Sequence, residues 1–303
     1  MDATPRALVN AFSIDVEDYF HVEALASAID RSQWDALEYR AEANTRRMLE
    51  ILAQERVRAT FFILGWVARR SPQLVRDIHA AGHEVACHGL THRTVYTQSP
   101  AVFRAETSEA KQRLEDATGT RVHGYRAATY SITSRSLWAL DILEELGFRY
   151  DSSIFPIRHD LYGIPGSPRF AHRVASGALL EVPITTVEWF GQRLPAGGGG
   201  YFRLLPYALF RAAVRRVNAR DRQSAVFYCH PWEIDPGQPR VAGVSAKSRF
   251  RHYTNLHQCE ARLARLLRSF RFTTMYSVLA DLQLLPEAPF RQSAIGASPD
   301  RGR

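Results

Sequence analysis

Two histidines four positions apart, His88 and His92, are the first residues whose types and spacing suggest chemistry. They follow an apolar run, residues 85–87, that is typical of the end of a short buried strand. If the chain turns helical directly after this strand, the spacing places both imidazoles on one face. Neutral imidazole nitrogens are good ligands for zinc, and a third ligand would leave one position open for water. The alternative is a pair of ordinary loop histidines, because this motif alone is not specific.

A cluster of three acidic residues, Asp15, Glu17 and Asp18, follows the first predicted strand, which covers residues 7–14. Three carboxylates so close together repel one another, and burying them unpaired is costly. A bound cation would resolve both problems. The cluster therefore predicts a metal ligand, and its alternative is the N-terminus of a helix, where acidic residues are common.

Three later apolar segments also end in polar residues, namely Arg126, Asp151 and His230. Segments of this kind alternate with amphipathic segments that are typical of helices. This alternation predicts a parallel α/β architecture, and a barrel fits because its functional residues gather at the carboxyl ends of the strands. The alternatives are a plain ion pair for Arg126 and a simple cap for residues 151–153.

The pattern predicts the following strands and helices. Strands are expected over residues 7–14, 59–64, 83–87, 122–127, 148–151, 225–229 and 272–276, and helices over residues 44–54, 72–81, 101–118, 134–146, 207–217 and 258–269.

We expect a single domain over residues 1–285 and a disordered polar tail over residues 286–303. Residues 155–205 break the alternation of strand and helix and are rich in proline and glycine. The aromatic residues interleaved there favour an ordered loop layer that covers a substrate, rather than a flexible connector. Residues 231–285 would form a C-terminal part of the same domain.

The composition bounds the class of protein. Of the 303 residues, 46% are hydrophobic and 23% are charged, which is ordinary for a globular protein. No apolar run approaches the roughly eighteen residues of a membrane-spanning helix. The first ten residues lack the features of a signal peptide. We therefore expect a cytoplasmic protein.

Cysteine content and charge add two expectations. Three cysteines fit a reducing compartment. Cys87 and Cys229 precede His88 and His230, and we interpret them as packing residues because neighbours in a strand point to opposite faces. The net charge of +8 favours an anionic partner and is compatible with peripheral association with the inner face of a membrane. The basic residues are scattered, so we expect no nucleic-acid partner.

With these residues in view, the chain resembles the polysaccharide deacetylases of carbohydrate esterase family four, the NodB-homology group. Five short motifs match in order: Asp15-x-Glu17-Asp18, His88-x-x-x-His92, Arg126 with Tyr130, Asp151-Ser152-Ser153, and His230-Pro231.

The resemblance runs from about residue 10 to residue 282. It is closest to a subgroup linked to exopolysaccharide loci and exosortase-type systems, at residues 15–20, 158–165, 195–203 and 230–236. It implies a distorted (β/α)7-type barrel with an ordered loop-rich insertion and a C-terminal extension.

Two positions depart from the family pattern. Val16 separates Asp15 from the next acid, so either Glu17 or Asp18 must supply the metal oxygen. We favour Glu17, because relatives with one residue between the two acids exist. Ala128 replaces the usual proline of the third motif, which concerns the rigidity of that loop and not its chemistry.

The resemblance implies a metal-dependent hydrolase that removes N-acetyl groups from an amino-sugar polymer or from its lipid-linked precursor. Asp15 would act as the base, and Arg126 would hold it charged and oriented. His230 would protonate the leaving nitrogen. Asp151 would orient Arg126 or His230.

The same resemblance implies a divalent metal, for which we expect zinc, held by Glu17, His88 and His92, with Asp18 as the alternative acidic ligand. Four aromatic residues are expected to bind the glycan: Tyr130, Tyr162, Tyr201 and Trp232. Two other functions remain open at this point. One is a metal-dependent amidohydrolase acting on a cyclic amide, as in allantoinase-like relatives, and the other is a non-catalytic carbohydrate-binding module.

Overall fold

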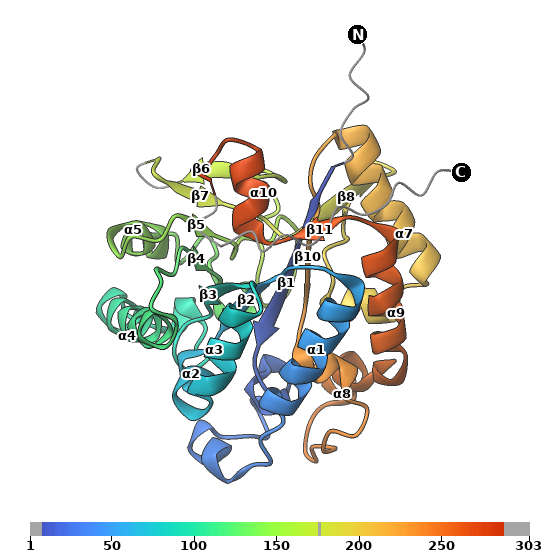
Figure 1. Cartoon of the computed structure of the whole chain (residues 1–303). Coiled ribbons are helices and arrows are strands. Elements are labelled where there is room, and N and C mark those ends of the chain that lie inside the picture. The colour runs from blue at the N-terminus through green and yellow to red at the C-terminus, as the bar shows by residue number, and fades with distance from the viewer. Residues whose placement is uncertain (1–7, 175–176, 288–303) are drawn as a thin grey trace.

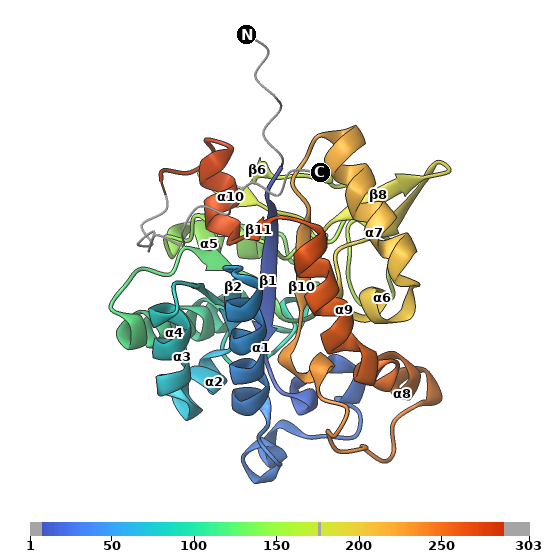
Figure 2. The same cartoon turned by 45° about the vertical axis from the view of Figure 1, so that its right-hand side comes forward.

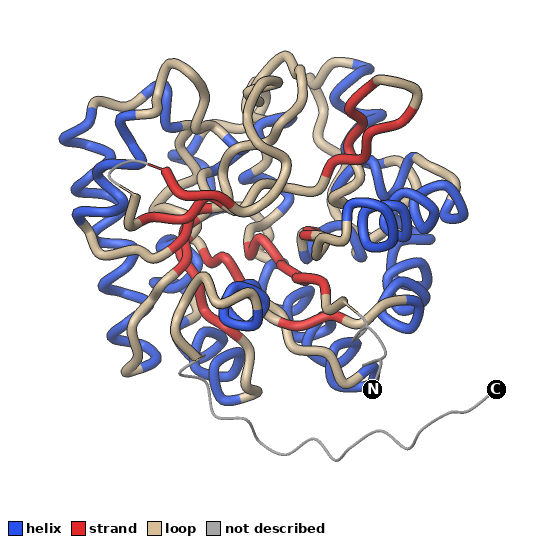
Figure 3. Tube along the Cα trace, turned by 90° about the horizontal axis from the view of Figure 1, so that it is seen from above, coloured by secondary structure: helices blue, strands red, loops and turns tan. Residues whose placement is uncertain are grey.

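Seven parallel strands form the centre of the fold, in a computed structural model that describes residues 8–174 and 177–287. They lie in the order β10-β1-β2-β3-β4-β5-β7, and the sheet curls so that it surrounds an interior (Figure 3). Two further strands join this sheet: β6 runs antiparallel to β7, and β11 runs parallel to β1.

The strands of the main sheet are β1 (Asn10–Val16), β2 (Thr60–Ile63), β3 (Glu84–Cys87), β4 (Gly124–Tyr125), β5 (Tyr150–Asp151), β6 (His172–Val174), β7 (Leu179–Glu181), β10 (Val226–Cys229) and β11 (Phe272–Thr273). A separate hairpin is formed by β8 (Thr186–Trp189) and β9 (Gln192–Pro195).

Helices surround the sheet, and β1 runs through the middle of the molecule between them (Figures 1 and 2). They are α1 (Ala41–Glu55), α2 (Gly65–Arg70), α3 (Pro72–Ala80), α4 (Pro100–Thr118), α5 (Trp138–Glu145), α6 (Gly199–Leu204), α7 (Tyr207–Arg216), α8 (Ala246–Tyr253), α9 (Leu256–Ser269) and α10 (Met275–Asp281). None of the helices in the described part of the chain has both the length and the apolar character required to cross a bilayer.

The side chains of each central strand alternate between two environments, as the pleat requires. On β1, Phe12 and Ile14 belong to the outer core that the surrounding helices complete. Ala11 belongs to a second, inner core together with Phe62 of β2, and α10 contributes Met275 to this inner core. Both faces of the strand are therefore buried, as is usual for parallel sheets covered by helices.

The sheet is not closed by a ladder of hydrogen bonds between β7 and β10 in the described part of the chain. The connecting segment fills this position instead, because the Gly197 carbonyl accepts a hydrogen bond from the Tyr228 N–H at 2.7 Å. The Thr185 hydroxyl likewise accepts from the Val226 N–H at 2.6 Å. The expected distorted α/β barrel is confirmed, and this gap is its main distortion.

Several element boundaries differ from those that the sequence predicted. Residue 7 of the first predicted strand lies outside the described residues, and the strand continues to Val16. The strand predicted over residues 122–127 is reduced to two residues. The last predicted strand is interrupted after Thr273, because the Thr274 side chain caps α10 by accepting from the Ser277 N–H.

The helix predicted to start at Ser134 begins only at Trp138. A turn takes its place, because the Ser136 hydroxyl accepts from the Thr133 N–H at 2.9 Å and donates to the Ser131 carbonyl at 2.9 Å. Serine side chains compete with helix formation by such local bonds.

The loop layer expected over residues 155–205 is ordered but is not made of loops alone. It contains β6, the hairpin β8–β9, and β7, whose three residues are all buried in the main sheet. The prediction missed β7 because three residues are too few to show a period. The predicted tail begins at residues 286–287, which are exposed, and residues 288–303 lie outside the described part of the chain.

Candidate active site

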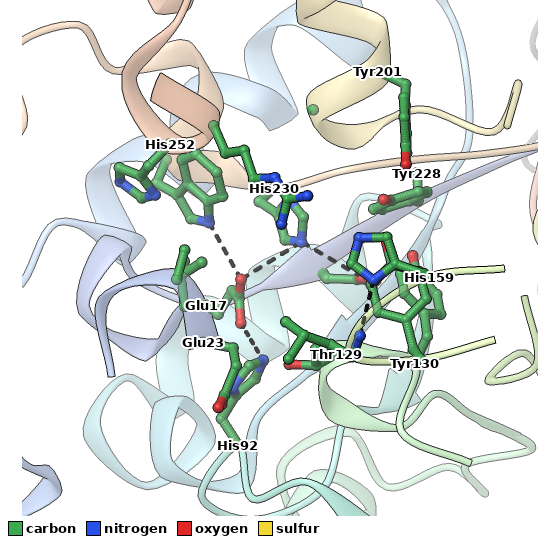
Figure 4. A pocket seen from close by; sticks show the side chains of 18 of the residues that line it. Glu17, Glu23, His92, Thr129, Tyr130, His159, Tyr201, Tyr228, His230 and His252 are labelled. Atoms are coloured by element: carbon green, nitrogen blue, oxygen red, sulfur yellow. Dashed lines mark hydrogen bonds and ion pairs between the residues drawn. The ribbon is translucent and has the colours of Figure 1, made fainter. Parts of the chain in front are cut away.

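A cavity of about 400 Å³ opens at the carboxyl ends of the parallel strands. Its lining comes from both halves of the chain, and Figure 4 shows these side chains converging from several elements. The residues at its base are Asp15, Glu17, His88, His92, Tyr130, Tyr228 and His230. Carboxyl ends of strands are the usual location of active sites in α/β barrels.

Strand alternation explains why Glu17 reaches the cavity. Ser13 and Asp15 point inward from β1, and Glu17 follows at the next position of the same parity. Ligand atoms of Glu17, His88 and His92 all lie within 4.8 Å of one another, and all three side chains are buried. The structure thus brings the two histidines and one carboxylate into a group that could hold a metal ion.

The histidines meet in a way that the sequence did not predict. Residues 88–94, directly after β3, are not helical. Instead an irregular turn has positive φ angles of 76° at Gly89 and 51° at His92. This turn brings the rings of His88 and His92 to a centroid distance of 5.5 Å. The prediction of a helical i, i+4 face was wrong, although the two residues do come together.

The donor set fits a divalent metal. Glu17 Oε2 lies 2.7 Å from His92 Nε2. Glu17 Oε2 and His92 Nδ1 are buried and have no hydrogen-bond partner of good geometry among the described residues. His88 Nδ1 lies 2.8 Å from the Arg126 carbonyl, which leaves Nε2 for a ligand bond. One carboxylate and two imidazoles are the ligand set of many catalytic zinc sites.

The protonation states of His88 and Glu17 also suit the binding of a metal ion. Burial lowers the pKa of His88 to about 4, so its ring is neutral near pH 7. Burial alone would raise the pKa of Glu17, but the neighbouring His92, His230 and His88 hold it below its usual value. A neutral imidazole and an ionised carboxylate are the forms that bind metal.

Asp18 points away from this group and caps two helices. Its Oδ1 accepts from the Tyr19 N–H at 2.8 Å, and its Oδ2 accepts from the N–H groups of Arg40 and Ala41 at 2.6 and 2.7 Å. Burial raises its pKa to about 6 despite these bonds. The alternative assignment of Asp18 as metal ligand is therefore not supported by its position.

Arg126 and Asp15 form a buried ion pair, with Arg126 Nη1 at 2.6 Å from Asp15 Oδ1. The same guanidinium donates to the hydroxyl of Ser13 at 2.9 Å and to the carbonyl and hydroxyl of Ser152 at 3.3 and 3.1 Å. Its plane lies over Phe62, with Cζ at 4.1 Å from the ring centroid. Arg126 is thus fixed from several sides, and it orients the carboxylate of Asp15.

Asp151 does not take the role that we expected, because it lies on the outer face of β5. The inner positions belong to its neighbours, Tyr150 in the inner core and Ser152 on Arg126. Asp151 Oδ1 accepts from the Ser153 hydroxyl at 2.5 Å, and no described bond joins it to Arg126 or His230. Its partner is Glu181, the residue opposite it on β7.

A carboxylate that the sequence analysis did not assign supports His230. Glu233 Oε1 lies 2.6 Å from His230 Nδ1, and Glu233 Oε2 accepts from Arg203 Nε at 2.6 Å. Burial alone would lower the pKa of His230, but the bond to Glu233 and the charges of Glu17 and Asp15 raise it to about 9. The signal was present in the sequence, since an acid three residues after a strand-terminal histidine can reach back to it.

Aromatic side chains form one continuous wall of the cavity. Tyr130 contacts both Tyr162 and Tyr228, with ring centroids at 5.8 and 5.1 Å. Tyr201 also lines the cavity. Trp232 stacks on His230 at 5.1 Å and donates from Nε1 to Glu17 Oε1 at 3.2 Å. All four aromatic residues expected to bind the glycan therefore line the same cavity, and Trp232 in addition holds Glu17.

Comparisons with known proteins divide the chain into two matched stretches. Residues 31–150 match the family model described as polysaccharide deacetylase, and residues 152–280 match a domain of unknown function, DUF3473. Over residues 31–150 the chain is therefore similar to the polysaccharide deacetylases. The resemblance noted from the five motifs is thereby confirmed at the level of this family. The second stretch supplies His230, Glu233 and Arg203, and the acidic cluster near residue 15 precedes both stretches.

A chitooligosaccharide deacetylase of Bradyrhizobium sp. (strain ANU 289) is 34% identical to this chain over 99 residues, which are 33% of this chain and 43% of that protein. The chain thus spans less than half the length of this relative.

Two solved structures share the fold. A putative polysaccharide deacetylase from Mycobacterium smegmatis has a TM-score of 0.59 at 22% identity, covering 96% of each chain. An allantoinase structure has a TM-score of 0.59 at 15% identity, covering 93% of this chain and 94% of that one. At these identities the likeness concerns the fold and does not choose between the two activities.

Proposed function

We propose that the protein is a metal-dependent deacetylase that hydrolyses the N-acetyl group of an amino sugar in a glycan. The observation that carries the proposal is the convergence of three groups in one cavity. These are the ligand cluster of Glu17, His88 and His92, the Asp15–Arg126 pair, and His230 with its supporting carboxylate.

Asp15 would accept the proton of the water that attacks the acetyl carbonyl. Arg126 holds this carboxylate in place from its own buried position, with Nη1 at 2.6 Å from Asp15 Oδ1. His230 would donate a proton to the amine nitrogen as the C–N bond breaks, because its raised pKa keeps it protonated near pH 7. His230 Nε2 lies 3.9 Å from Asp15 Oδ2, so the base and the acid face the same space. The products would be acetate and a free amino sugar.

Glu17, His88 and His92 would hold the metal, for which we propose zinc. When bound, such an ion lowers the pKa of a coordinated water and polarises the acetyl carbonyl. The histidine and carboxylate ligands also suit other first-row metals, so zinc is chosen on the ligand set alone.

The aromatic wall favours a sugar as substrate. Tyrosine and tryptophan offer flat apolar faces together with polar edges, and Tyr130, Tyr201 and Trp232 all line the cavity. We extend the proposal to glycans of exopolysaccharide biosynthesis, on the resemblance at residues 158–165 and 195–203. The net charge of +8 would also suit a lipid-linked, phosphate-bearing precursor at a membrane surface.

The test is acetate release from a panel of N-acetylated chitooligosaccharides, peptidoglycan fragments and polymers, with allantoin as a cyclic-amide control, each with and without chelator. The proposal expects acetate from at least one glycan and loss of that activity with chelator. Hydrolysis of allantoin alone would support the cyclic-amide alternative. Binding of glycans without any hydrolysis by the metal-loaded protein would support a carbohydrate-binding module.

A further inference from the structure

One stretch of the chain lines the cavity without a role in the chemistry described above. It is the loop of residues 155–164, which presents His159, Leu161 and Tyr162 to the cavity. In Figure 4, His159 stands with Tyr130, Tyr201 and Tyr228 on one side of the view, while Glu17 and His92 lie toward the other side. A substrate bound among these groups would meet the imidazole of His159.

The loop is built to hold one conformation. The Phe155 carbonyl accepts from the N–H groups of Ile157 and Ile164 at 2.8 and 3.0 Å. Gly163 has a φ of +100°, and a Cβ there would lie 2.2 Å from the Ile157 carbonyl oxygen. Only glycine tolerates this close approach at a positive φ. These hydrogen bonds and the close approach at Gly163 therefore fix the loop near both of its ends.

The imidazole of His159 is itself fixed by stacking. Its ring lies on Tyr162 at a centroid distance of 3.8 Å and an interplanar angle of 10°. Phe155 lies parallel to Tyr162 at 5.8 Å, with an interplanar angle of 1°. Stacked rings of this kind hold a side chain in place before any ligand arrives, which lowers the entropy lost on binding.

The hydrogen bonds of the ring decide which nitrogen carries a proton. The Leu161 N–H donates to His159 Nδ1 at 3.2 Å, so the neutral ring carries its proton on Nε2. Asp160 Oδ1 lies 3.0 Å from the same Nδ1 and would pair with it if the ring were protonated. In the protonated ring, and in the neutral ring whose Nδ1 accepts from Leu161, Nε2 has a proton to donate. No hydrogen-bond partner for Nε2 is found among the residues that the structure describes.

Two cationic side chains near this wall pair with one carboxylate. Lys247 Nζ lies 2.9 Å from Asp160 Oδ2, and Arg251 Nη1 lies 3.7 Å from the same oxygen. Both residues line the cavity, but they share this one carboxylate. His159 Nε2, in contrast, has no hydrogen-bond acceptor among the residues that the structure describes.

We propose that His159 is a substrate-binding residue whose Nε2–H donates a hydrogen bond to an oxygen of an N-acetylated sugar held in the cavity. The accepting oxygen is a hydroxyl or the amide carbonyl, because both are uncharged acceptors that such a sugar offers. Tyr162 is a positioning residue in this account, since it fixes the plane of the His159 ring. The inference rests on the proposed function, because the class of sugar is taken from that proposal.

The experiment compares three variants of the full chain loaded with zinc. His159→Phe keeps a ring to stack on Tyr162 but removes the donor. His159→Gln places an amide N–H near the position of Nε2 but removes the ring. His159→Ala removes both. For each, the dissociation constants of the N-acetylated chitooligosaccharide di-, tri- and tetrasaccharides are measured by calorimetry, and kcat and KM are measured by acetate release.

A lost neutral hydrogen bond should raise the dissociation constant and KM about three- to tenfold in His159→Phe. Its kcat, zinc content and melting temperature should stay near those of the wild type. His159→Gln should recover part of the affinity that His159→Ala loses. Wild-type affinity in His159→Phe would overturn the proposal, because the ring would then serve only to hold the loop.

The two proposals fail in different ways. A wild-type protein that binds the oligosaccharides but releases no acetate contradicts the deacetylase activity, and the binding constants of the variants still decide the role of His159. A wild-type protein that releases acetate, with equal constants in His159→Phe, contradicts the role of His159 alone. A wild-type protein that binds none of these sugars contradicts both.

Discussion

The imidazole of His230 and the carboxylate of Glu233 are joined by a contact of 2.6 Å between Nδ1 and Oε1; His230 lines the cavity, and Glu233 is buried behind it. Burial alone would raise the pKa of Glu233, but the adjacent Arg203 and His230 lower it to about 2. The carboxylate is therefore ionised at every pH at which the enzyme would work, and it supports the protonated form of His230.

The variant Glu233→Gln tests this support. Because Glu233 raises the pKa of His230, its removal should lower that pKa from about 9. His230 acts as an acid in the proposed reaction, so activity falls as pH rises through its pKa. The basic limb of kcat/KM against pH should move to lower pH in the variant. Asp235→Asn is a suitable control, since Asp235 pairs with Arg40 outside the cavity. An unmoved basic limb would show that His230 does not act as the acid.

The variant Arg126→Lys tests the orientation of Asp15. A lysine cannot reproduce the several directed bonds of the guanidinium to Asp15, Ser13 and Ser152. We expect a loss of roughly 10²-fold or more in kcat, which is the usual contribution of a positioned base. Unfolding measurements should show a loss of about 3 kcal/mol, as is typical when a buried pair is disrupted. Retention of wild-type kcat would contradict the role of the pair.

Two neighbouring acids should respond differently to isosteric replacement. Glu17→Gln should lower zinc occupancy, as measured by metal analysis after dialysis, because it removes the charge from the ligand cluster. Asp18→Asn should keep its zinc but lose about 1–3 kcal/mol of stability, since its amide group would face N–H donors of Arg40 and Ala41. The reverse pattern would transfer the ligand role to Asp18.

The buried pair of Asp151 and Glu181 predicts a pH dependence of stability. Burial raises the pKa of Asp151 to about 6, and burial together with the Asp151 charge raises the pKa of Glu181 well above its usual value. At these two sites the folded protein binds more protons than the unfolded chain above about pH 4, so the contribution of the pair to the free energy of unfolding should fall as pH rises from there through about 6 and beyond. Each unit of pKa difference corresponds to about 1.4 kcal/mol.

Thermal unfolding of Glu181→Gln against pH checks this account. The variant cannot ionise at this position, so its stability relative to the wild type should increase as pH rises from about 4 to 7. A constant difference between the two proteins across this range would mean that the pKa of Glu181 is not raised in the folded protein. Glu188→Gln, an exposed glutamate of β8, is the control.

Much of the fold could be predicted from hydrophobic periodicity, because the longer helices and strands contain enough residues to show a period. The helices at residues 41–55 and 100–118 and the strands at residues 10–16 and 226–229 are close to their predicted bounds. The three-residue strand β7 was missed, since it is held by its neighbours in the sheet and not by its own pattern.

The part of the site that could be predicted from the sequence is the part that the alternation of side chains along a strand places. Asp15, Glu17, Arg126 and His230 all occupy inward positions at strand ends, and they meet in the cavity. Asp151 was assigned from its motif and from its place at a strand end, but its side chain lies on the outer face of β5, away from the site. The contact of Glu233 with His230 was within reach of the sequence, because the acid stands three residues after the histidine. The contacts of His159 depend on the shape of its loop, which sequence patterns do not predict.

The central claim is that one metal ion bound by Glu17, His88 and His92 makes this cavity active. It is tested most directly by removing metal from the protein, adding zinc stepwise and following acetate release from a chitooligosaccharide. We expect no activity without metal, a linear rise and saturation at one equivalent of zinc per chain, and neither rise nor saturation in His92→Ala. Full activity in protein shown by metal analysis to be free of metal would contradict the account.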